Sequence, residues 1–293
     1  MDAKLIKQLK DMSNAGLMDC KKALEATNGD IDEAIKYLRE KGISKAAKKA
    51  DRVAVEGLSN IIVDGNNAVI YEVNCETDFV SANEKFKALV DVIGKTLING
   101  NATTLEEALS LPTEDGTLND TIINVTATMG EKISLRRFTK LTKTDSQNFG
   151  DYIHMGGKIA VLTVIEGANQ EVAKDVAMHS AAMRPQYVKS SDVPTEALEE
   201  EMKIIKEQLL NEGKPEKIIE ERIMPGKVEA YYSEVCLENQ VFVKAENGET
   251  VIEPQYDNII IPNIERTISS ALFIFKYGLF IFILPFYSAL YPL

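Results

Sequence analysis

The sequence is poor in the residues that build metal centres and disulfide frameworks. Its 293 residues include two histidines, His154 and His179, and three cysteines, Cys20, Cys75 and Cys236. The cysteines are odd in number, lie far apart and form no CxxC pair, so reduced thiols in the cytosol fit better than a disulfide framework. Neither a metal-ligand cluster nor a phosphate-binding loop is visible, and no cofactor is expected.

Positive charge is also scarce. Lys and Arg number 33 against 45 Asp and Glu, which gives a net charge of -12. Tight nucleic-acid binding needs concentrated basic residues, so direct contact with nucleic acid is not expected. The first residues, 1–4, lack the apolar core of a signal peptide, and a cytoplasmic location is expected. The remaining composition is that of a globular chain with two or three domains.

Long apolar runs are absent except in an atypical C-terminal tail, residues 245–293. Within it, residues 271–293 hold eight of the chain's 20 aromatic residues. The run 273–285 is marginal in length for a membrane span, and Lys276 and Pro285 interrupt it, so membrane association is not expected. A shifted reading frame or altered C-terminus explains the tail best, a membrane anchor second, and a partner-binding helix third.

The N-terminal region, residues 1–53, is predicted to form three short helices and a linker. Leu5, Leu9 and Met12 recur at helical spacing, and a second helix covers residues 17–24. Asp30, with Glu33 three residues later, predicts a reciprocal N-terminal cap for the third helix. Gly42 is expected to end that helix, and a basic, alanine-rich helical connector follows over residues 45–52.

Two units that combine sheet and helix are expected next, residues 54–140 and 141–244, which makes the fold class α+β. Each begins with a strand hairpin and continues into a helix, so the second unit repeats the first in architecture. The expected elements are strands 58–63, 68–73 and 133–140 with helices 84–98, 103–109 and 118–129, then a hairpin over 152–165 and a helix over 170–183.

A protruding antiparallel helical hairpin is expected at about residues 190–237. Its first helix, residues 195–211, carries a coiled-coil stripe of apolar side chains. The turn follows at residues 211–215, and Pro225-Gly226 should interrupt the returning helix. The stripe consists of Leu198, Met202, Ile205 and Leu209.

The segment from Asn74 to Asn83 joins a predicted strand to a predicted helix, a place where side chains meet partners. From spacing alone, Thr77 or Asp78 could simply cap the helix and Phe79 could fill the core beneath it. Alternatively, an acidic side chain beside a large exposed ring is well placed to wedge into another protein.

Several of these segments resemble the bacterial-type elongation factor Ts family. The resemblance covers about residues 1–244. It is carried by residues 15–24, 28–30, 38–42, 52–57, 74–80, 152–154, 157–158 and 176–185. It implies an N-terminal three-helix fold like that of ubiquitin-associated domains. Members normally continue into a further strand and a terminal helix, a pattern that the tail lacks; without that strand the second unit would have lost part of its sheet.

The resemblance also implies a function: guanine-nucleotide exchange, without covalent chemistry, on GDP-bound elongation factor Tu. The segment that displaces the partner's magnesium ion would consist of Thr77, Asp78, Phe79 and Val80. Further contacts with the partner would come from Met18, Asp19, Cys20, Lys21 and His179. Two departures from the family pattern are Ser180, where another small or branched apolar residue is usual, and Pro225, where Glu is often found.

Alternative interpretations stay open at this point. Residues 19–22 could be an N-cap followed by a solvated helix face, and His179 could be a helix histidine with a satisfied neighbour. A thiol enzyme using Cys75 and His179 needs the two side chains to be adjacent in space. A ubiquitin-type adaptor built on the N-terminal helices is a third class of function.

Overall fold

The computed structural model describes residues 2–13, 15–245, 248, 250–251 and 282–285. The chain divides into two compact units. One is built on Met1–Thr142 with Met155–Ile159, and the other on Lys143–His154 with the described residues of Ala160–Leu284. Residues predicted as two separate regions, 1–53 and 54–140, therefore lie within a single unit.

Three helices open the first unit: α1 (Ala3–Ser13), α2 (Leu17–Ala26) and α3 (Ile31–Ala47). They enclose a small core of buried side chains, namely Leu9, Cys20, Ala23, Leu24 and Ala34. The mixture of helix and sheet that follows confirms the α+β class.

The predicted start of α3 is confirmed only in part. The Asp30 carboxylate accepts the Glu33 N–H at 2.9 Å, but the Glu33 carboxylate pairs with Lys36 at 2.8 Å instead of returning to the cap. The predicted end at Gly42 is wrong, because α3 continues to Ala47. Gly42 is buried against Ala127 of a later helix, α7 (Leu118–Met129), and this packing offsets the low helix propensity of glycine.

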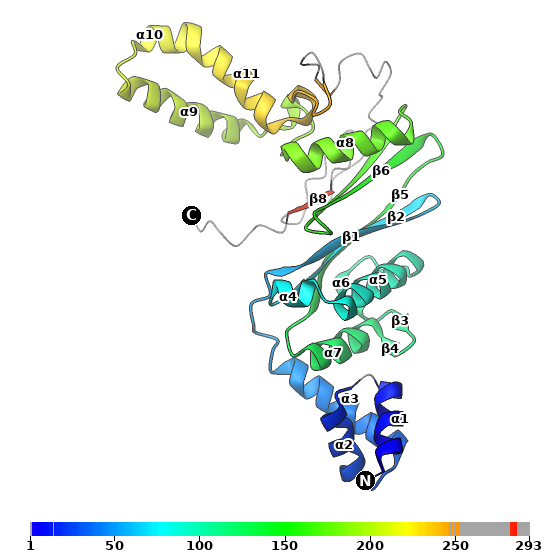
Figure 1. Ribbon diagram of the computed structural model, residues 1–293. Coiled ribbons are helices and arrows are strands. Elements are labelled where there is room, and N and C mark those ends of the chain that lie inside the picture. The colour runs from blue at the N-terminus through cyan, green and yellow to red at the C-terminus, as the bar shows by residue number, and fades with distance from the viewer. Residues whose placement is uncertain (1, 14, 246–247, 249, 252–281, 286–293) are drawn as a thin grey trace. The chain divides into compact units, whose positions relative to one another are not determined.

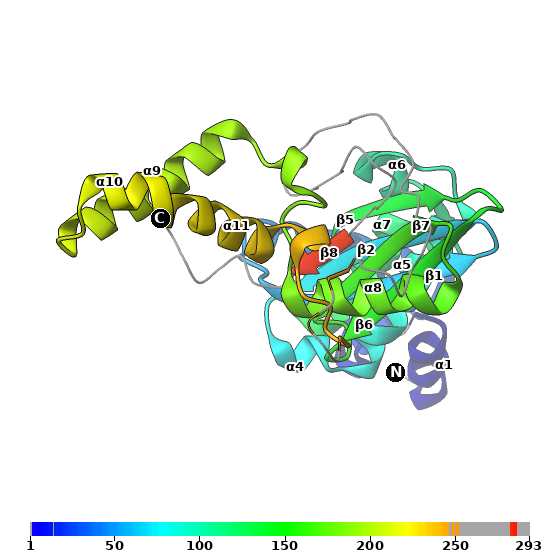
Figure 2. The same ribbon diagram turned by 90° about the horizontal axis from the view of Figure 1, so that it is seen from above.

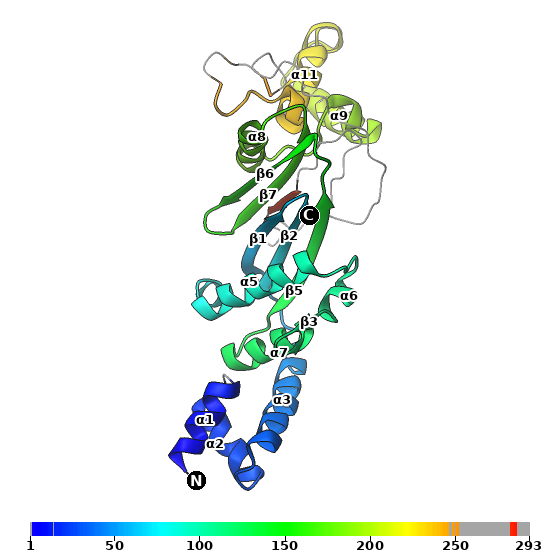
Figure 3. The same ribbon diagram turned by 90° about the vertical axis from the view of Figure 1, so that its right-hand side faces the viewer.

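A three-stranded antiparallel sheet forms the centre of the first unit. Its strands are β1 (Glu56–Asp64), β2 (Asn67–Cys75) and β5 (Ser134–Thr142), in the order β1-β2-β5. One face of β2 contributes Val69, Tyr71, Val73 and Cys75 to the main core. Figure 3 shows α5 (Glu84–Asn99) alongside this sheet.

Helices and a short hairpin complete the first unit. In chain order they are α4 (Asp78–Ser81), α5 (Glu84–Asn99), α6 (Leu105–Leu109), β3 (Pro112–Thr113), β4 (Gly116–Thr117) and α7 (Leu118–Met129). The predicted apolar stripe of α5 is confirmed, because Phe86, Leu89, Val90, Ile93 and Leu97 are all buried. Tyr71 reaches past Gly94 and donates its hydroxyl to the Val90 carbonyl at 2.9 Å.

The second unit repeats the hairpin-and-helix arrangement. Strands β6 (Gln147–His154) and β7 (Ile159–Glu166) are followed by α8 (Gln170–Met183). Helix α8 packs on β6, as Figures 1 and 2 show. Gly150 permits this close approach, because a Cβ there would overlap with the Ala173 carbonyl oxygen. A third strand, β8 (Phe282–Pro285), completes the order β6-β7-β8, in a sheet that the sequence was expected to leave incomplete.

Two helical segments of the second unit lie side by side in Figures 1 and 2. They begin after η1 (Ser190–Asp192) and are α9 (Thr195–Asn211), then α10 (Glu216–Ile218), η2 (Ile219–Ile223) and α11 (Met224–Val235), with η3 (Leu237–Asn239) beyond. Lys206 of α9 joins the two by pairing with Glu216 at 3.0 Å and Glu220 at 2.6 Å.

The predicted interruption at Pro225-Gly226 takes a particular form. The backbone does not stop but changes to a π-helical turn, η2, immediately before Pro225 enters the first turn of α11. Proline lacks an N–H and clashes with the carbonyl four residues earlier, and a wider turn relieves both problems.

Most of the apolar tail lies outside the described residues, β8 excepted. The three explanations offered for it therefore stay predictions. Among the residues that the structure does describe, no helix combines the length and the apolar character needed to cross a bilayer.

Candidate functional site

A short loop and the four-residue helix α4 follow the end of β2 and carry the predicted site. Here the side chains of Asp78 and Phe79 are exposed, Phe79 to 84 %, whereas Val80 is buried with 8 % exposed. The interpretation in which Phe79 fills the core is therefore wrong, because Val80 takes that place in the core of the first unit. The exposed ring of Phe79 is therefore available for contact with another molecule.

Thr77 faces inward and caps α4. Its Oγ1 accepts the Val80 N–H at 3.4 Å and donates its proton to Glu131 Oε1 at 2.7 Å. The other Glu131 oxygen, Oε2, accepts the backbone N–H groups of Glu76 at 3.2 Å and Thr77 at 3.0 Å. One carboxylate thus satisfies three donors of the loop.

A second set of contacts joins the Glu76 carboxylate and Lys132 to the N-terminal linker. The Glu76 carboxylate accepts the Lys132 N–H at 2.6 Å and lies 3.3 Å from Arg52 Nη1. The Lys132 N–H bond and the Arg52 guanidinium lower the pKa of Glu76. The Lys132 ammonium donates to the carbonyls of Ala50 and Arg52, which fixes the end of the N-terminal linker beside the loop.

Cys75 does not have the surroundings of a nucleophile. Its thiol is fully buried at the end of β2 and donates to the Thr77 carbonyl at 3.2 Å. Burial, with Glu131 nearby, raises the pKa of Cys75 to about 12, so the reactive thiolate is rare at neutral pH. The alternative of a thiol enzyme using Cys75 is not supported by this geometry.

His179, the other member of that pair, is fully buried in the second unit. Its Nδ1 accepts the Val243 N–H at 3.1 Å, so Nε2 carries the proton and donates to Gln240 Oε1 at 3.0 Å. Gln240 in turn donates to the carbonyls of Glu234 and Met183. The imidazole matches the alternative of a satisfied helix histidine and is not available to contact a partner directly.

The residues predicted on α2 divide between surface and core. Met18 is 60 % exposed, and Lys21 is exposed with its ammonium 3.8 Å from Glu25. Asp19 is partly exposed, whereas Cys20 is fully buried in the helical core. A partner that docks on α2 can touch Met18, Asp19 and Lys21, and Cys20 can only support them.

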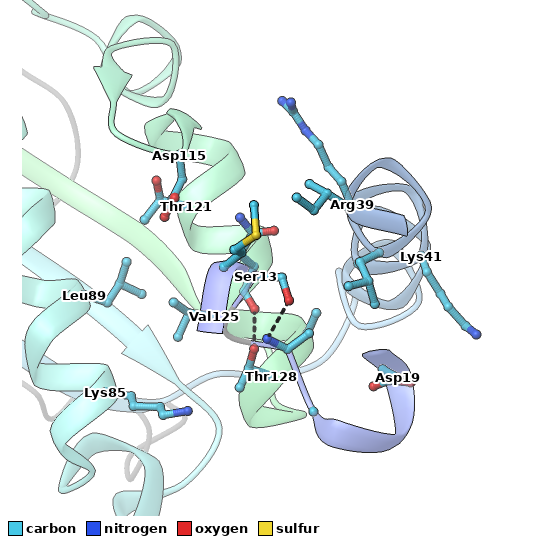
Figure 4. A pocket seen from close by; sticks show the side chains of 18 of the residues that line it. Ser13, Asp19, Arg39, Lys41, Lys85, Leu89, Asp115, Thr121, Val125 and Thr128 are labelled. Atoms are coloured by element: carbon cyan, nitrogen blue, oxygen red, sulfur yellow. Dashed lines mark hydrogen bonds between the residues drawn. The ribbon is translucent and has the colours of Figure 1, made fainter. Parts of the chain in front are cut away.

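A cavity of about 550 Å³ lies within the first unit, among α1, α2, α3, α5 and α7. Figure 4 shows Asp19, Arg39 and Lys85 around it together with apolar side chains such as Val125. Arg39 is engaged by Asp120 at 2.6 Å. Charges of both signs over apolar walls do not favour one class of ligand. In the described part of the chain no group of three or more His, Cys, Asp or Glu residues could hold a metal ion.

Sequence reasoning missed the roles of Glu131, which holds Thr77, and Gln240, which holds His179, and it also missed the contact of Glu76 with Lys132 and Arg52. Glu131 and Thr77 are 54 residues apart, and Gln240 and His179 are 61 apart. A usable signal existed for Glu131, since it follows Gly130 at the end of the predicted helix 118–129, where glycine commonly ends a helix.

Comparison with known proteins agrees with the resemblance found in the motifs. The family model described as Elongation factor TS matches residues 76–256, beyond the limit of 244 inferred from motifs alone. Curated proteins named Elongation factor Ts include one from Limosilactobacillus reuteri (strain DSM 20016), 54 % identical over 239 residues and 82 % of each chain. Those from Limosilactobacillus fermentum (strain NBRC 3956 / LMG 18251) and Acholeplasma laidlawii (strain PG-8A) are 51 % identical over 83 % of each chain. The chain therefore belongs to the elongation factor Ts family.

Proposed function

We propose that this chain releases GDP from elongation factor Tu by inserting Phe79 and Asp78 beside the nucleotide's magnesium ion. The observation that supports the proposal most strongly is the exposure of Phe79, 84 %, on a loop whose backbone is held by Glu131. Covering this exposed ring with another molecule would remove its apolar surface from water, which is favourable.

The proposal treats exchange as a linkage between two binding sites. If the chain binds nucleotide-free elongation factor Tu more tightly than the GDP-bound form, GDP must bind more weakly to the complex by the same factor. A 10⁴-fold effect needs a coupling free energy of about 5.5 kcal/mol. Fully burying a phenylalanine side chain supplies about 1.5–3 kcal/mol. Phe79 alone is therefore insufficient, and other contacts must supply a comparable share.

Asp78 is the nearest source of such a contribution. It is exposed beside Phe79 in the first turn of α4. A carboxylate introduced near a magnesium site competes for the polar groups that position the ion, and the ion bridges the phosphate oxygens. Thr77 and Val80 would act from below, as the cap and the apolar anchor that hold this pair.

The remaining contacts are proposed to come from regions outside the loop. The N-terminal helices, as a ubiquitin-associated-like bundle over residues 1–53, would dock through Met18, Asp19 and Lys21. The helical hairpin at about 190–237 would reach the partner from the second core unit, residues 141–244. The first core unit, residues 54–140, would carry the wedge. No covalent step or cofactor is involved, and the reaction would take place in the cytoplasm.

The experiment is release of a fluorescent GDP analogue from purified elongation factor Tu, with full-length chain in substoichiometric amount. Acceleration with turnover is expected, because an exchange factor leaves each partner molecule after exchange. Phe79→Ala should slow release roughly thirtyfold, the equivalent of about 2 kcal/mol. Val63→Ala, at the opposite end of β1 from the loop and 41 % exposed, is the matched apolar control and should leave the rate unchanged. Wild-type release with Phe79→Ala would refute the wedge.

A further inference from the structure

The segment that carries Phe79 begins where the backbone pairing of the first unit's sheet ends. The pairing of β2 with β1 ends at Cys75 opposite Glu56, and its pairing with β5 ends at Asn74 opposite Ser134. The N–H groups of the next two residues, Glu76 and Thr77, therefore have no strand partner. Buried or half-buried N–H groups need an acceptor, and at this point a side chain must provide it.

Glu131 provides that acceptor. It lies in the short link between α7 and β5, after Gly130, which ends α7 with a left-handed φ of 81°. Ile133, two residues further, is buried in the core. Because both ends of this link are anchored, the carboxylate is held in one place, and its two oxygens receive the N–H groups of Glu76 and Thr77 and the Thr77 hydroxyl.

The Thr77 hydroxyl transmits this constraint to α4. A hydroxyl has one proton and two lone pairs. The proton goes to Glu131, which leaves a lone pair directed at the Val80 N–H as the N-cap. A helix of four residues has no stability of its own, so its direction depends on its cap and on the burial of Val80. That direction decides where Asp78 and Phe79 point.

We propose that Glu131 is a positioning residue for nucleotide exchange: its carboxylate holds the 76–77 backbone and, through Thr77, aims Asp78 and Phe79 at the partner. This inference rests on the exchange function proposed above and assigns a role to a residue 54 positions from Thr77 in the chain. The proposal assigns Glu131 no contact with the partner's nucleotide or its metal.

The test is Glu131→Gln in the full-length chain, measured by release of the fluorescent GDP analogue from elongation factor Tu. The amide keeps the shape of the side chain, but its nitrogen cannot accept, so charge-assisted bonds to the loop are lost. Release should slow roughly tenfold, the equivalent of one such bond. Thr77→Val, which removes the hydroxyl at similar volume, should slow release similarly, and Thr77→Ser should restore it.

Glu107→Gln is the matched control. The Glu107 carboxylate also accepts two backbone N–H groups and a threonine hydroxyl, from Thr103 at 2.8 and 2.9 Å and from Thr104 at 3.2 Å. It performs this role at α6, in the same unit but without a hydrogen bond to the Phe79 loop. Glu107→Gln should leave the release rate unchanged.

A double-mutant cycle separates positioning from general damage to the fold. In a Phe79→Ala, Asp78→Ala background, Glu131→Gln should have almost no further effect, since there is no wedge left to aim. An equal slowing in both backgrounds, or no slowing by Glu131→Gln in the wild-type chain, would overturn the inference. Failure of the proposed function is recognised separately, because Phe79→Ala alone would then release GDP at the wild-type rate.

Discussion

The two units share a hairpin followed by a helix, yet they differ at the junction between the two. In the second unit β7 ends at Glu166, and Gly167, with φ of 79°, leads through Ala168 to Asn169, which caps α8. In the first unit β2 ends at Cys75, and residues 76–82, including α4, come before Asn83 caps α5. The first unit has thus inserted a short helix where the second has a plain turn.

The two junctions differ in how many contacts hold them and in the side chains that they expose. The plain turn is held by few contacts, such as Asn148 Nδ2 to the Ala168 carbonyl at 2.7 Å. The inserted segment is held by Glu131, Thr77 and Val80, and it leaves Phe79 in water. This elaborate support has no role in closing the hairpin, and it is explained if the exposed ring must be presented in one direction.

Gly150→Ala, in the second unit, is expected to have the largest effect on the free energy of unfolding. A Cβ at residue 150 would overlap with the Ala173 carbonyl and the Thr163 hydroxyl, so α8 must move away from β6. The free energy of unfolding should fall by about 3 kcal/mol, at the upper end of overpacking costs. Urea denaturation measures it, and hydrogen exchange should show the loss in α8. Unchanged protection of α8 would contradict the close approach.

Val80→Ala should have the next largest effect, because it removes the apolar anchor under the inserted helix. The side chain is 8 % exposed within the core of the first unit. Loss of two methyl groups and the resulting cavity should lower the free energy of unfolding by about 2 kcal/mol. Phe79→Ala should change it by less than about 0.5 kcal/mol, as for an exposed position. Equal destabilisation by the two substitutions would remove the distinction between anchor and wedge.

Acid should weaken the second unit through His179. Burial lowers the pKa of His179, so the folded state keeps the imidazole neutral while the unfolded chain binds a proton near its ordinary value of about 6.5. Stability is therefore full above that pH and falls as the pH decreases below it, by at most about 1.4 kcal/mol per pH unit. Thermal melts between pH 7.5 and 5 measure the slope, and His179→Gln should flatten it. An unchanged slope in that variant would exclude His179 as the source.

The smallest effects should come from the two N-caps. Asn83 accepts the Lys85 N–H and Asn169 accepts the Val172 N–H, both at 2.9 Å. Alanine at either position should lower the free energy of unfolding by about 1 kcal/mol. The Asn83 backbone N–H donates to the Val80 carbonyl at 3.0 Å, and alanine keeps that bond, so GDP release should be unaffected by Asn83→Ala although it lies only four residues from Phe79. A clear slowing there would extend the functional segment past α4.

Sequence reasoning worked where periodicity and local caps decide the structure. The helices predicted over residues 118–129, 170–183 and 195–211 match α7, α8 and α9, and the last of these was predicted from its apolar stripe. It failed at Gly42, where contact with Ala127 of α7 outweighs local propensity. Long-range packing of that kind leaves no mark in the surrounding sequence.

At the candidate site too, long-range contacts decided what the local sequence pattern could not. Spacing alone could not decide whether Phe79 is buried or exposed, because either of two adjacent residues in a short helix can face the core. The direction is decided by Glu131, whose distance along the chain hides it from motif reading. His179 was expected to contact the partner, with a satisfied helix histidine as the alternative, and the second holds because Gln240 and Val243 return from far along the chain to bond both ring nitrogens.

The central claim is that the ring of Phe79 favours the nucleotide-free partner over the GDP-bound one. The most direct test is to measure the affinity of the full-length chain for both forms of elongation factor Tu, with wild-type and Phe79→Ala side by side. The account predicts that the preference of the wild-type chain for the nucleotide-free form falls roughly thirtyfold in the variant, while binding to the GDP-bound form changes little. An equal change in both affinities, or none in either, would contradict it.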